Sequence, residues 1–80
     1  MKVLFHGRLA EAIGAELELE AQAGCSVAEI RERLLIRHPD IAETLRSRHA
    51  RAFIGDRLVH DDHVMRAGET VEFLPPVSGG

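Results

Sequence analysis

Cysteine is nearly absent from the sequence: Cys25 stands alone, so no disulfide bond can form within the chain. Such low cysteine usage is typical of reducing compartments and predicts a cytoplasmic location. Long hydrophobic runs are also missing, since none approaches the roughly 20 residues that a membrane-spanning helix needs. The segment 1–6 is too short and too quickly polar for a signal peptide. We therefore expect no membrane as a partner.

Basic charge is scarce as well, with 10 Lys and Arg residues against 13 Asp and Glu residues. The resulting net charge of −3 argues against nucleic acid as a partner, because phosphate binding requires a basic excess. The short basic stretch 46–51 has no aromatic neighbours, which favours a solvated loop. No Ser/His/Asp arrangement, phosphate-binding glycine loop or pair of catalytic carboxylates is recognisable. The chain thus brings no evident catalytic apparatus of its own.

Two polar features come closest to a chemical site. His60, Asp61, Asp62 and His63 are ligand types for a transition metal, but no further His or Cys has suitable spacing. Cys25 precedes a predicted helix, yet no His or Asn is placed to activate it. We expect a polar turn and a structural thiol here, with no metal bound.

Hydrophobic alternation and capping signals predict the secondary structure. A capping box, Ser26 to Glu29, opens the main helix, and Pro39 ends it. An amphipathic turn is expected within 7–14 and a short helical piece within 40–45. The predicted strands are 1–6, 16–20, 50–54, 58–59 and 70–74.

The main helix is expected to lie across a sheet. Its apolar stripe consists of Val27, Ile30 and Leu34. We place Arg31 with the charged residues on the opposite, solvent-facing side. A hairpin, a helical crossover and further strands indicate a small mixed sheet with one main helix on one face. The predicted class is α+β with a β-grasp arrangement, formed by residues 1–75 and followed by a flexible tail, 76–80.

The end of the sequence is its most informative feature. Pro75 and Pro76 remove N–H donors, so strand pairing should end at Leu74. Beyond them, Gly79 and Gly80 would form a stalk without side chains that can enter a narrow tunnel in another protein. A free carboxylate is a poor acyl donor until a partner enzyme activates it, for example as an acyl-adenylate. The alternative is a frayed terminus without function.

Several segments resemble one known family. The ending 68–80, GETVEFLPPVSGG, is similar throughout to that of the small, sulfur-carrying subunits of molybdopterin synthases, within the MoaD/ThiS group of ubiquitin-like sulfur carriers. Further segments with this resemblance are 3–5, 8–14, 58–59 and 62–63. Three features depart from the family pattern: His6 where an apolar residue is frequent, Ala10 where arginine is common, and a Gly-Asp turn at 55–56.

The resemblance implies a non-catalytic carrier. An E1-like adenylyltransferase would use ATP to activate the Gly80 carboxylate, and a cysteine desulfurase or rhodanese-like protein would supply the sulfur of a thiocarboxylate. The tail would then enter the active site of the large synthase subunit, within a heterotetramer. There it would deliver sulfur to cyclic pyranopterin monophosphate, building the dithiolene of molybdopterin. Gly79 would be required for access, and no cofactor would stay bound to the chain.

A partner must also hold the body of the domain. Strand alternation places His6 and Leu74 on the sheet face opposite the helix, and Leu58 is a plausible third member of an exposed patch. The alternative is that single exposed leucines carry no meaning. With the tail residues, the predicted partner-binding set is His6, Leu58, Leu74, Pro75, Pro76, Val77 and Ser78.

Three other functions are compatible with an activated Gly-Gly end or with this fold. The chain could carry sulfur for thiamine thiazole or cysteine biosynthesis, although such carriers usually lack Pro-Pro-Val-Ser before the glycines. It could be a ubiquitin-like modifier that forms isopeptide bonds with lysines. It could also be an interaction domain with an inert tail.

Overall fold

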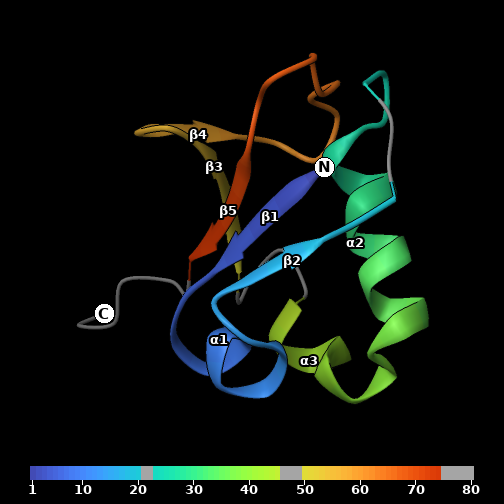
Figure 1. The fold of residues 1–80 in the computed structure, drawn as a ribbon, viewed down its shortest axis with the longest axis vertical. Helices are drawn as coiled ribbons and strands as arrows, with labels where there is room; N and C mark the ends of the chain where they lie inside the picture. Colours follow the sequence, from blue (N-terminus) through green and yellow to red (C-terminus); the bar gives the residue numbers. More distant parts are fainter. Residues whose placement is uncertain (21–22, 46–49, 75–80) are drawn as a thin grey trace.

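The structure is a computed structural model, and it describes residues 1–20, 23–45 and 50–74. Strands and helices alternate in the first part of the chain, and three strands follow the last helix, as Figure 1 shows. The elements are β1 (Lys2–Phe5), α1 (Gly7–Ile13), β2 (Glu16–Glu18), α2 (Val27–Arg37), the 3-10 helix η1 (Pro39–Ile41), α3 (Ala42–Leu45), β3 (Arg51–Ile54), β4 (Arg57–Val59) and β5 (Val71–Leu74).

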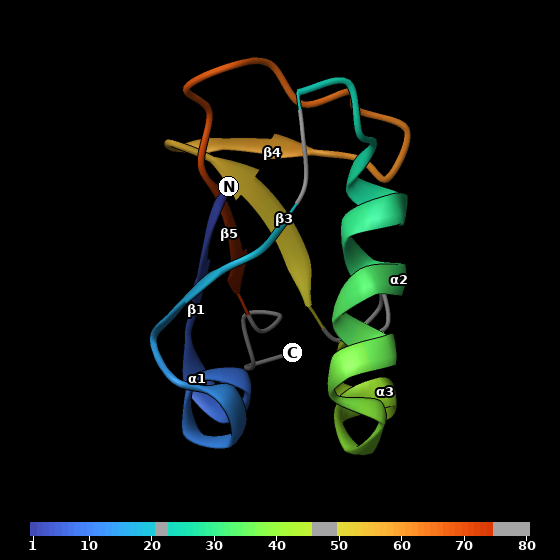
Figure 2. The ribbon, with the colours of Figure 1, turned by 45° about the vertical axis from the view of Figure 1, so that its right-hand side comes forward.

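The strands form one five-stranded sheet in the order β2-β1-β5-β3-β4. The first and last strands, β1 and β5, pair in parallel at its centre, and the other neighbours are antiparallel. Helix α2 crosses one face of this sheet (Figure 2). The predicted α+β class and the predicted mixed sheet are both confirmed.

Helix α2 begins where its sequence predicts. The Ser26 hydroxyl accepts a hydrogen bond from the Glu29 N–H at 3.2 Å, and the Glu29 carboxylate accepts one from the Ser26 N–H. This reciprocal capping satisfies N–H groups that have no partner within the helix. The apolar stripe, Val27, Ile30 and Leu34, is fully buried against the sheet.

The core between α2 and the sheet comes from alternate residues of the two central strands. Phe5 of β1 and Phe73 of β5 are paired in register, and their rings stack with centroids 6.1 Å apart. Val3 and Val71, two residues earlier on the same strands, are also paired and are completely buried. The alternation read from both strands is therefore confirmed.

The placement of Arg31 on the solvent side of the helix is wrong. This side chain is only 8% exposed, and its Nε donates to Asp61 Oδ1 at 3.0 Å. Its guanidinium also donates to the Leu45 carbonyl and lies 4.9 Å from the centre of the Phe73 ring. Position 31 is one turn beyond Val27, hence on the buried side. An arginine is tolerated there because a carboxylate, a carbonyl and a ring face meet its charge.

Three further boundaries differ from expectation. Residues 7–13 form a complete short helix where a single turn was predicted, and the piece within 40–45 divides into η1 and α3. Gly14 ends α1 with a φ of 101°, a conformation that side chains disfavour. The second strand stops at Glu18, although Leu19 remains buried in the core. Residues 46–49 of the basic stretch lie outside the described residues.

Candidate functional site

The sheet face opposite α2 is the candidate site. The register aligns one residue from each of four strands in a row: Leu4 of β1, Glu72 of β5, Phe53 of β3 and Leu58 of β4. Paired residues point to the same side of a sheet, so these four share one face. We call the open face the surface formed by Leu4, His6, Phe53, Leu58, Glu72 and Leu74.

The open face presents apolar side chains that the core does not use. Leu4, Phe53 and Leu74 are partly exposed, and Leu58 is 40% exposed. None of the four belongs to the core cluster or packs against it from its margin. Among the described elements, no helix covers this face, since α2 lies across the other one (Figure 2). A group of exposed apolar side chains of this kind is typical of an interaction site.

A His–Glu contact lies among these apolar side chains. His6 Nε2 is 2.5 Å from Glu72 Oε2, and the two side chains are 46% and 27% exposed. Glu72 belongs to the central strand, between Leu4 and Phe53 in register. Glu72 therefore lies in the middle of the face, and His6 reaches it from the end of β1.

The last described residue, Leu74, lies at an edge of the open face. Leu74 is the last residue of β5, and Arg51, the first residue of β3, lies opposite it. Because β1 and β5 are parallel, His6 at the end of β1 lies at the same edge of the sheet. The predicted site residues Pro75, Pro76, Val77, Ser78, Gly79 and Gly80, and the predicted domain boundary at 75/76, lie outside the described residues.

The three predicted partner-binding residues within the described chain, His6, Leu58 and Leu74, do share one face. Whether a partner binds them stays a prediction. Phe53 is not among the predicted partner-binding residues, and Leu4 was not assigned to the patch. A signal for Phe53 was present: the small buried Ala52 alternates with the larger Arg51 and Phe53, which marks the outward positions of β3.

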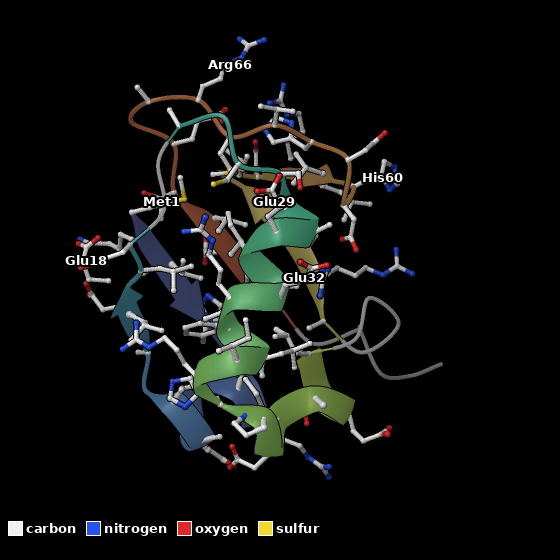
Figure 3. The ribbon with its side chains drawn as sticks, turned by 90° about the vertical axis from the view of Figure 1, so that its right-hand side faces the viewer. Met1, Glu18, Glu29, Glu32, His60 and Arg66 are labelled. Carbon is white, nitrogen blue, oxygen red and sulfur yellow. The ribbon has the colours of Figure 1, made fainter. Side chains whose placement is uncertain are left out.

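The His-Asp-Asp-His segment has a structural role that the sequence did not reveal. The Asp61 and His63 carbonyls accept hydrogen bonds from the Ala28 and Val27 N–H groups, both at 3.0 Å, and so complete the N-terminal cap of α2. Figure 3 shows His60 at the outer edge of the molecule, beside the first turn of the helix that carries Glu29. Within the described ranges, no three His, Cys, Asp or Glu side chains are grouped so as to hold a metal ion.

A second His–Glu contact stabilises the turn before β5. His63 Nε2 lies 3.3 Å from Glu69 Oε1, which also accepts the Arg66 N–H at 2.8 Å. The Arg66 hydrogen bond, and then His63, hold the pKa of Glu69 below its ordinary value. Similarly, the N-terminal ammonium 2.8 Å from Glu18 lowers the pKa of that carboxyl.

Cys25 is a buried residue whose carbonyl accepts the Met65 N–H at 2.8 Å. This backbone pairing joins the start of α2 to the segment before β5.

Across the described part of the chain, no helix is both long enough and apolar enough to span a bilayer.

The mixed sheet with one main helix on one face and an open opposite face defines a ubiquitin-like β-grasp domain. The chain belongs to the ThiS family, whose model matches residues 3–80. It is 30% identical to the molybdopterin synthase sulfur carrier subunit of Escherichia coli K12, over all of this chain and 99% of that protein.

Solved structures share the fold at lower identity. The small archaeal modifier protein 1 of Haloferax volcanii superposes with a TM-score of 0.78 at 18% identity, covering 95% of both chains. A chain from a complex of subunits 1 and 2 of the molybdopterin-converting factor of Helicobacter pylori gives 0.67 at 22% identity, covering 99% of this chain and 96% of that one.

Proposed function

We propose that this protein is the sulfur carrier subunit of a molybdopterin synthase. The observation that carries the proposal is the full-length relationship to the Escherichia coli sulfur carrier subunit, together with a family match that extends to residue 80. The fold supports it, because in this β-grasp body the last described strand, β5, ends with Leu74 at the edge of the open face.

In this function the Gly80 carboxylate is the reactive group. An adenylyltransferase joins it to ATP as an acyl-adenylate, and pyrophosphate leaves. A persulfide sulfur on a donor protein then attacks the carbonyl carbon and displaces AMP, which gives an acyl disulfide. A thiol cleaves its S–S bond, releasing the thiocarboxylate and forming a disulfide with the donor. Adenylation is needed because an ionised carboxylate at neutral pH is a weak electrophile. The chain supplies the carrier, and the activating enzyme consumes the ATP in the cytoplasm.

The partner for sulfur delivery is the large subunit of the synthase. The open face docks on it through Leu4, Phe53, Leu58 and Leu74, while the tail enters its active site. The small size of the domain favours this division: one face forms the core, and the other remains free for a partner. In the Helicobacter pylori relative, the corresponding subunit was solved in complex with a second subunit.

Intact-protein mass spectrometry tests the chemistry. After incubation with the activating enzyme, ATP and a sulfur donor, we expect the full chain to exchange one oxygen for sulfur. A variant lacking Gly80 should not react and should keep the melting temperature of the parent. Cys25→Ala is the matched control, because it removes the thiol and leaves the tail unchanged. Isopeptide adducts on lysines in place of a thiocarboxylate would show a modifier, and sulfur transfer by the variant without Gly80 would refute the proposal.

A further inference from the structure

The contact between His6 and Glu72 affects how the open face can dock. His6 and Glu72 are both partly exposed in the free protein, so water solvates the carboxylate as well as the imidazole. A partner that covers Leu4 and Phe53 removes that water, because Glu72 lies between them in register. A carboxylate without a counter-ion is costly to bury, whereas one that receives a charge-assisted hydrogen bond is tolerated.

The chain carries the required counter-ion itself. The 2.5 Å separation of His6 Nε2 and Glu72 Oε2 is that of a direct hydrogen bond. Only a protonated imidazole both donates this bond and cancels the carboxylate charge. Docking therefore favours the protonated form of His6 over the neutral form.

Resting on the docking described above, we propose that the His6–Glu72 pair is a specificity element that binds to the large subunit as an intact, neutral ion pair. The partner surface it fits is apolar at this point. A partner that presents a cation to Glu72 is disfavoured, because that cation would meet the charge of His6. The affinity is consequently linked to the protonation of His6, because a molecule whose His6 is neutral must take up one proton in order to bind.

Other charged groups lie around the pair. On the β1–β2 side, Lys2 pairs with Glu16 at 3.5 Å, and the N-terminal ammonium pairs with Glu18 at 2.8 Å. Arg51 projects from β3 opposite Leu74, and α1 carries the exposed Arg8 and Glu11. Of these, the α-amino group alone belongs to a class that titrates near neutral pH. It lies at the opposite end of β1 from His6.

Calorimetric titration of the full chain with the large subunit, from about pH 6 to about pH 8.5, tests the proposal, since imidazoles change charge in this interval. We expect the dissociation constant to rise by up to about tenfold per pH unit in the upper part of this range, as uptake of one proton requires. Repeating the titration in buffers of different ionisation enthalpy counts the proton directly.

Two variants assign the proton to the pair. His6→Gln should weaken binding by about tenfold or more at low pH, because Glu72 is then buried uncompensated. It should also flatten the pH profile. The double variant His6→Gln, Glu72→Gln should recover affinity and stay flat, and any slope that it retains belongs to the α-amino group or to the partner. His63→Gln is the matched control, since it removes the imidazole of a His–Glu contact away from the open face.

The outcomes separate this inference from the proposed function. Tight binding with the same pH profile in the parent and in His6→Gln would overturn the inference and leave the proposed function intact. Equal affinity of the single and double variants would overturn it as well. Absence of binding to the large subunit at every pH would overturn the proposed function, and the inference with it. Melting curves of each variant establish that the fold is retained.

Discussion

The two faces of the sheet are built from alternate residues of the same strands, and they differ in what covers them. On the α2 side, Val3, Phe5, Val71 and Phe73 are at most 2% exposed. On the open face, the intervening residues of β1 and β5 stay partly exposed, and a His–Glu pair lies among them. One strand thus supplies the core with every second residue and offers the others to a partner.

The comparison also shows how each face treats charge. Arg31 on the buried side is met by Asp61, the Leu45 carbonyl and the Phe73 ring, so its cost of desolvation is offset within the chain. The pair on the open face is half solvated and meets its full desolvation only when a partner binds. The charge on the core side is therefore compensated when the chain folds, whereas the charges on the open face are desolvated only on binding and can discriminate between partners.

The largest expected effect on stability comes from replacing one phenylalanine on each face by alanine and comparing the two losses. Phe73→Ala should lower the free energy of unfolding by about 3 to 5 kcal/mol, because it leaves a cavity under α2. Phe53→Ala on the neighbouring strand should cost about 1 kcal/mol or less, since its side chain lies outside the core. Urea denaturation of both variants measures the difference. Equal losses would contradict the assignment of the two faces.

Features that depend on local sequence could be predicted, whereas features that depend on contacts between distant segments could not. Alternation and the Ser26–Glu29 capping box identify the strands and the main helix because both depend on local sequence. Alternation around Ala52 marks Phe53 as outward, but the residues that surround Phe53 on the open face follow from pairing between β3 and β5, which are distant in the sequence. Arg31 was misplaced for a similar reason: its partners Asp61 and Leu45 come near only in the folded chain.

A second, smaller effect tests binding without stability. Leu58→Asp and Leu74→Asp should each weaken binding to the large subunit by about 2 kcal/mol, roughly 30-fold in Kd, because a charge is buried against an apolar partner. The melting temperature should change little. Ile36→Asp is the matched control, since Ile36 is 81% exposed on α2 and faces away from the sheet. Parent-like affinity of the double variant in calorimetry would exclude the open face as the docking surface.

The smallest expected effect on stability concerns the turn that leads into β5, the strand that contributes residues to both faces. The pKa of Glu69 is lowered from 4.5, chiefly by the Arg66 N–H and then by His63, so its ionised form stabilises the fold. This contribution is fully present above the ordinary carboxyl pKa and is lost as the pH falls through the lower, native value.

Glu69→Gln keeps an acceptor for the Arg66 N–H but lacks the charge. We expect a slightly lower urea midpoint than the parent at pH 7 and a smaller difference between the two proteins at about pH 3, below the usual carboxyl range. Glu11→Gln, an exposed change on α1, provides the control. A constant difference between parent and Glu69→Gln at both pH values would instead assign the effect to packing of the turn.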